Sequence, residues 1–165
     1  MASKKGIAVT AAILVGVVAA SFLVYLLPED TTMKISISDF ENHLDITKER
    51  ATMEVTGIDE SFQKLMNNEI GPDEYISIAE VSASQLNSLI IELTNSGATQ
   101  EWSESYVNYI IALKKVNDKI TETVVVANLI TDDSNSDSIN EILAKIKQLE
   151  TESLDLIKKS DSSRP

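Results

Sequence analysis

The residues of this chain that could do chemistry are few, because it contains one histidine, His43, and no cysteine. Asp39 stands four residues before His43, so in a helix the two side chains share a face and could pair or bind a metal ion together. Two ligands fall short of the three or four that a transition-metal site uses. Position 40 is Phe, so the Glu-x-x-His pattern of di-iron bundles is missing. We therefore expect His43 to lie on a helix surface, and we expect no metal and no cofactor.

A second candidate for chemistry is the acidic run at residues 133–137 (DSNSD), which offers oxygen ligands at alternate positions as a calcium loop would. The EF-hand pattern then requires Gly and Glu at positions where this chain has Ser138 and Ala144. We interpret the run as a solvated loop. Glycine-rich phosphate loops and the Gly-x-Ser-x-Gly nucleophile motif do not occur in the sequence. The chain is predicted not to be an enzyme, and no small-molecule substrate is expected.

Three aromatic residues with helical spacing could form a binding patch: Trp102, Tyr106 and Tyr109. Positions separated by four and three residues lie on one face of a helix. Such a stripe is typical of a bundle core in which the polar tips of Trp and Tyr reach water. An exposed interaction patch is the alternative interpretation.

Composition excludes several classes of function. The 165 residues include 14 Lys+Arg and 26 Asp+Glu, for a net charge of −12. Nucleic acid requires a basic surface, so it is excluded as a partner. The absence of cysteine excludes a disulfide scaffold. The length allows one modest domain with an appendage.

The appendage is an uncharged apolar stretch at residues 6–27, which is long enough to cross a bilayer as a helix. Two lysines precede it and two acids follow it, so residues 1–5 are predicted to be cytoplasmic and the rest to lie outside the cell membrane. A cleavable signal peptide is the alternative, but the run is longer than the usual apolar core of such a peptide. Small residues recur at every fourth position of the span, where another membrane helix could pack: Ala8, Ala12, Gly16 and Ala20.

The remainder is predicted to be all-α, with a linker at 28–35, a helical domain at 36–159 and a disordered tail at 160–165. Apolar residues step by three and four through four segments, near 36–70, 72–95, 99–130 and 138–159. Ser38 and Ser138 each begin a capping-box pattern. Gly71 is expected to end the first helix in a left-handed conformation, and Pro72 to open the second. Short turns favour an antiparallel, up-down-up-down four-helix bundle. The near-heptad spacing leaves an alternative, long helical hairpins completed by dimerisation.

These features predict a non-enzymatic, single-pass membrane protein whose bundle acts as a structural or interaction module, or as an accessory subunit of a membrane or cell-surface complex. A protein partner or self-association is expected. The layout, with one crossing and long antiparallel helices outside the membrane, resembles the periplasmic four-helix sensor domains of chemoreceptors and histidine kinases. That resemblance implies the alternative function, a ligand-sensing module that relays its signal through a partner.

Overall fold

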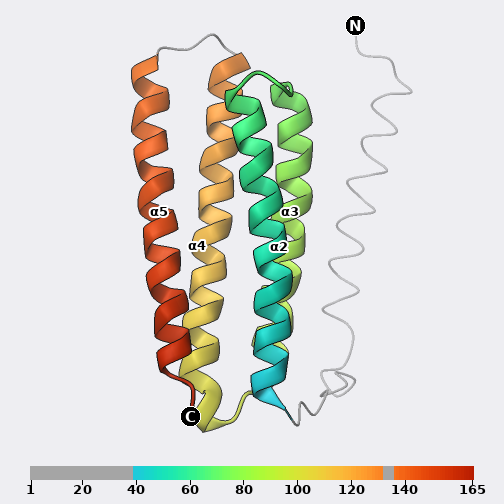
Figure 1. The fold of residues 1–165 in the computed structure, drawn as a ribbon, viewed down its shortest axis with the longest axis vertical. Helices are drawn as coiled ribbons and strands as arrows, with labels where there is room; N and C mark the ends of the chain where they lie inside the picture. Colours follow the sequence, from blue (N-terminus) through green and yellow to red (C-terminus); the bar gives the residue numbers. More distant parts are fainter. Residues whose placement is uncertain (1–38, 132–135) are drawn as a thin grey trace, which may run out of the picture. The chain divides into compact units, whose positions relative to one another are not determined.

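The computed structural model describes residues 39–131 and 136–165, all of which belong to one compact unit. They form four long helices joined by short connections (Figure 1). Within these ranges no residue is in a β-strand, so the predicted all-α helical bundle is confirmed. The helices are α2 (Phe40–Met66), α3 (Pro72–Asn95), α4 (Gln100–Thr131) and α5 (Ser136–Ser162).

The predicted membrane span, residues 6–27, lies outside the described residues, and so do its small residues Ala8, Ala12, Gly16 and Ala20. Among the helices that the structure describes, none combines the length and the apolar character needed to cross a membrane. The membrane anchor therefore stays a prediction from the sequence.

Helix α2 begins one residue later than the predicted capping box would place it. Asp39 is the N-cap, and its carboxylate accepts a hydrogen bond of 3.0 Å from the backbone N–H of Asn42. Asp and Ser are equally favoured at this position, so the pattern around Ser38 could not distinguish two adjacent caps. The helix then continues through Gly57 as predicted, because the packing on both sides outweighs the modest cost of a mid-helix glycine.

The turn between α2 and α3 corrects the predicted role of Gly71. Asn68 takes the left-handed conformation there, with φ of 59°, which Asn tolerates better than most residues. Gly71 has an extended backbone and is the N-cap of α3, and Pro72 occupies the first turn as predicted. Helix α3 stops just before Gly97, whose φ of 65° favours glycine.

Helix α5 extends further at both ends than the sequence predicted. It begins at Ser136, so Ser138 lies inside the helix and does not cap it. It continues to Ser162, and Ser160 is fully buried, so the prediction of a disordered tail at 160–165 is wrong. Residues 132–135, which include part of the calcium-like run, lie outside the described residues.

The main core joins the apolar stripes of α2, α3 and α4. Helix α5 adds only the partly buried Leu156 and Ile157 to this cluster, and its buried Ile146 and Leu149 are not part of it. Burial of each large apolar side chain contributes about 1.5–3 kcal/mol. The largest fully buried apolar residues of the main core are Leu44, Ile58, Leu65, Tyr75, Leu86, Leu93 and Leu113.

The four helices do not close into a square. Helix α4 contacts each of the other three, but no Cα atom of α5 lies within 8 Å of a Cα atom of α2 or α3. Figure 1 shows α4 standing between α5 and the α2–α3 pair, and the C-terminus returning to the end where α2 begins. The bundle is therefore a three-helix core with a fourth helix attached along α4.

Candidate functional site

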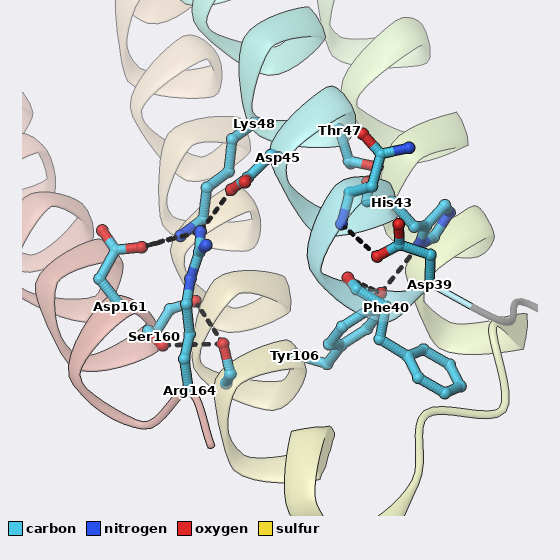
Figure 2. Close-up of polar contacts among 12 residues, drawn as sticks. Asp39, Phe40, His43, Asp45, Thr47, Lys48, Tyr106, Ser160, Asp161 and Arg164 are labelled. Carbon is cyan, nitrogen blue, oxygen red and sulfur yellow. Dashed lines mark hydrogen bonds and ion pairs between the residues drawn. The ribbon is translucent and has the colours of Figure 1, made fainter.

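His43 lies between helices and is not the free surface residue that the sequence predicted. Its Nδ1 atom is 2.9 Å from Tyr106 Oη, and its Nε2 atom is 3.1 Å from Glu92 Oε1. The ring also stacks on Tyr106, with centroids 5.9 Å apart and an interplanar angle of 17°. Figure 2 shows His43 and Tyr106 together near the start of α2. The side-chain partners of His43 are thus on α3 and α4, while Asp39 caps α2.

The partners of His43 extend the contacts to other elements. Glu92 Oε2 accepts a hydrogen bond of 2.8 Å from Arg50 Nη1. Tyr106 Oη donates to the backbone carbonyl of Phe40 at 2.9 Å. Side chains from α2, α3 and α4 therefore meet in one polar cluster that fixes the first turn of α2.

The chemistry available to this cluster is limited because Tyr106 holds its proton firmly. Burial, followed by the nearby charge of Asp39, raises the pKa of Tyr106 to about 12. At neutral pH the phenol is therefore a hydrogen-bonding group and not a nucleophile. In the parts of the chain that the structure describes, no group of three or more His, Asp or Glu is placed to bind a metal ion. The contacts of this cluster fasten α2, α3 and α4 to one another.

A second polar cluster, which we call the terminal clasp, joins α2 to the end of the chain. It consists of Asp45, Lys48, Asp161 and Arg164 (Figure 2). Arg164 Nη2 lies 2.5 Å from Asp45 Oδ1 and 3.2 Å from Asp161 Oδ1, and Lys48 pairs with Asp161. The hydrogen bond to Asp45 raises the pKa of Arg164 further, so this guanidinium is always charged.

A buried hydroxyl pair holds α5 against α4 beside the clasp. Ser105 Oγ donates to the backbone carbonyl of Ser160 at 2.7 Å, and the two Oγ atoms are 3.2 Å apart. Both residues are fully buried. The Ser160 carbonyl is one of the last four in α5, which have no partner within the helix, so Ser105 satisfies it.

Further along the helices from the clasp, α2 and α5 remain apart and leave a groove of about 180 Å³, which we call the α2–α5 groove. Its floor is α4, with the apolar surfaces of Tyr109, Leu113 and Val116. Val55 lines it from α2 and Leu154 from α5, and half of the Leu154 surface remains exposed. The groove is the place where the fourth side of a closed bundle would lie.

One partly buried ion pair joins Lys119, in the floor of the groove, to Asp59 of α2. Lys119 is 5% exposed, and its Nζ atom donates to both carboxylate oxygens of Asp59, at 2.7 and 2.9 Å. A buried ammonium group requires such a partner. The pair ties α4 to α2.

The predicted aromatic stripe divides between core and surface. Tyr106 and Tyr109 are 2% and 3% exposed, so neither belongs to an exposed interaction patch. Trp102 is half-buried and meets Tyr106 edge-on, with centroids 6.5 Å apart. The three residues thus serve mainly as packing between α4 and its neighbours.

Sequence reasoning missed the residues that connect distant elements. Lys119 lies at helical spacing with Val116 and Thr123 inside an otherwise apolar stripe, and that position was a signal for a buried charge. The terminal clasp joins residues more than a hundred positions apart, so no local pattern could predict it.

Comparison of the chain with known protein families, with curated proteins and with solved structures finds no match.

Proposed function

We propose that this chain is a non-enzymatic, single-pass membrane protein whose helical bundle lies outside the membrane and acts as an interaction module or accessory subunit. The observation that carries the proposal is the α2–α5 groove. Leu154 of α5 is half exposed there, and Val55 of α2 and Ile157 of α5 are partly exposed, above a floor of buried core residues of α4. Uncovered apolar surface of this kind marks contact sites between proteins.

The polar clusters support a binding role over catalysis. The contacts of His43 and Arg50 and the terminal clasp all join one helix to another. Tyr106 retains its proton at neutral pH, so the cluster contains no activated nucleophile. Groups used in this way stabilise a surface that a partner can recognise.

The alternative function, a ligand-sensing bundle, has less support. Pockets for small molecules usually enclose about 300–1,000 Å³. The α2–α5 groove offers about 180 Å³ and is open along one side. An open groove of this kind suits contact with a second protein surface better than it suits a small molecule, which usually binds in an enclosed pocket.

The membrane part of the proposal is tested by fractionating cells that produce the full chain. The protein should sediment with membranes and resist extraction at alkaline pH. Replacing Leu14 and Val17 together by Arg puts two charges in the predicted span, each costing about 2.5–3.5 kcal/mol there, and should release the protein. The matched control replaces the exposed Ile46 and Met53 of α2 by Arg and should leave the protein in the membrane. Full extraction of the unaltered chain would contradict the anchor.

The interaction part is tested by extraction in a mild detergent, with the mass of the particle read by light scattering. A mass well above one chain supports the proposal, and other polypeptides in the same peak identify the accessory-subunit role. A single chain with nothing else bound would rule out a stable interaction module.

A further inference from the structure

We propose that the α2–α5 groove binds a second copy of this chain, in a two-fold symmetric dimer whose bundles lie parallel and side by side. The inference deepens the proposed function by naming the partner. In such a dimer α2 of each copy packs against α5 of the other, because a two-fold axis along the groove places unlike helices opposite each other. The second copy covers the side of the bundle that the chain leaves open.

The terminal clasp fixes which residues of α2 and α5 are level with each other. Lys48 pairs with Asp161, and three residues earlier in α2 Asp45 pairs with Arg164, three residues later in the chain. The two helices are antiparallel, so moving one residue toward the C-terminus of α2 corresponds to moving one residue toward the N-terminus of α5. Val55 is therefore level with Leu154, and both line the groove.

This register places charges of opposite sign at matching heights on the outer edges of the groove. Glu60 of α2 lies within two positions of the level of Lys147 in α5, and Glu49 of α2 lies within two positions of Lys158. All four side chains are exposed. Within the described part of the chain, Glu60, Glu49 and Lys147 are in no ion pair, and Lys158 has only a 3.4 Å contact with Asp155.

Two-fold symmetry converts this arrangement into complementary contacts. Glu60 and Glu49 of α2 in one copy meet Lys147 and Lys158 of α5 in the other, and the same contacts are repeated across the axis. The apolar residues between the edges, including Leu154 and Val55, then lose contact with water. A helix of unrelated sequence is not expected to carry opposite charges at these same levels.

The chain beyond the described residues favours the same orientation. Residues 1–38 join the bundle at Asp39, and the C-terminus lies at the same end. Copies anchored through the predicted span would stand in the same direction on one membrane. That constraint removes the antiparallel pairings and leaves the parallel one that the charges fit.

Disulfide trapping in the full-length protein in membranes tests the contact directly, since the chain has no cysteine of its own. The test variant carries Thr56→Cys and Leu154→Cys, two positions that line the groove at nearly the same level. Within one chain the Cα atoms of these helices are more than 8 Å apart, too far for a disulfide without movement of the backbone. Mild oxidation should therefore give a covalent dimer.

The matched control carries Val81→Cys and Ile91→Cys, which are at least as exposed as Leu154 but lie on α3, away from the groove. It should remain monomeric under the same oxidation. Equal trapping of both variants would mean random collision and would overturn the proposal. So would absence of a trapped dimer in the groove variant.

Charge reversal supplies a second readout that does not depend on cysteine. Glu60→Lys alone and Lys147→Glu alone should each weaken dimerisation about tenfold, since each places like charges across the axis twice. The variant with both changes should regain the original affinity. Reversing Glu80 and Lys114, exposed residues of α3 and α4, should change nothing. Failure of the double variant to recover would contradict the predicted pairing.

The outcomes separate this inference from the proposed function. A membrane-bound chain that co-purifies with other polypeptides but gives no groove dimer retains the function and loses the inference. A dimer that survives the groove variants but is lost on replacing Gly16 by Ile would place the contact in the membrane span and overturn the groove.

Discussion

Arg164, the penultimate residue, donates to Asp45 in the second turn of α2 at a distance of 2.5 Å. The two residues are 119 positions apart, and their contact brings the end of the chain back to where the bundle begins. The clasp therefore joins two helices that have no close backbone approach anywhere along their length.

Removing the clasp should loosen the end of α5 at a small cost in global stability. Arg164→Ala removes the ion pairs to Asp45 and Asp161, which are half-exposed carboxylates. Exposed pairs of this type contribute about 0.2–1 kcal/mol, and less in salt. Urea unfolding at low and high ionic strength would measure the loss. Lys159→Ala, at an exposed position outside the clasp, is the control. A loss of several kcal/mol would show that the clasp does more than pair surface charges.

Removing the buried hydroxyl of Ser105 should lower the free energy of unfolding more than removing an exposed hydroxyl does. Ser105→Ala leaves the buried Ser160 carbonyl without its donor, which costs about 1–3 kcal/mol. Ser77→Ala removes a comparable hydroxyl bond at 3.0 Å from an exposed position on α3, and its effect should be about 0.5 kcal/mol or less. Thermal unfolding of both variants gives the comparison. Equal changes in the two would mean that Ser160 finds another donor.

The two partners of the buried ion pair should respond unequally to removal. Asp59→Ala leaves the Lys119 ammonium buried and unpaired, and we expect a loss of about 2 kcal/mol, reduced from the fully buried case because Asp59 is 40% exposed. Lys119→Met keeps an unbranched apolar side chain in place and leaves a carboxylate that water can reach, so about 1 kcal/mol or less is expected. The double variant should be more stable than Asp59→Ala alone. The unfolding free energies of the original chain and the three variants complete a double-mutant cycle. Strictly additive losses would show that Asp59 and Lys119 are not energetically coupled.

Stability should decline at alkaline pH because the described tyrosines are buried. Burial raises the pKa of Tyr75 and of Tyr106 to about 12, and it also raises the pKa of Tyr109. Above pH 10 the unfolded chain releases these protons before the folded chain does, so the free energy of unfolding falls between pH 10 and 12. The contribution of Tyr75 is on the order of 1–2 kcal/mol after allowance for solvent screening.

The alkaline effect can be followed through the absorbance of the phenolate during a pH titration. Tyr75→Phe should flatten the pH dependence of stability between pH 10 and 12, although it also removes the hydrogen bond to Thr123. Ionisation of Tyr75, Tyr106 and Tyr109 near pH 10 with the helices intact would be incompatible with their burial.

The sequence was sufficient for the helices because the signals that set them are local. The stripe of three- and four-residue steps predicted each helix, and Pro72 marked the first turn of α3. The exact first and last residues of the helices were harder to predict, because each of several consecutive polar residues can cap a helix. Asp39 displaced Ser38 as the cap, and Asn68 displaced Gly71 as the left-handed residue.

Local sequence patterns could not predict the contacts of the candidate site. His43 meets Glu92 and Tyr106 only because α3 and α4 turn those residues toward α2, a result of packing that spacing along one helix does not encode. The same holds for the open side of the bundle. Alternating helix directions predicted which helices are antiparallel, but not that the backbone of α5 would lie close to α4 alone.

The close backbone approach of α5 to α4 alone has a consequence for how the protein acquires its structure. A chain folds from its N-terminus during synthesis. Helices α2, α3 and α4 hold almost all of the main core, so that core can form once α4 has emerged. Helix α5 then docks last, onto a finished surface, and its backbone approaches only α4.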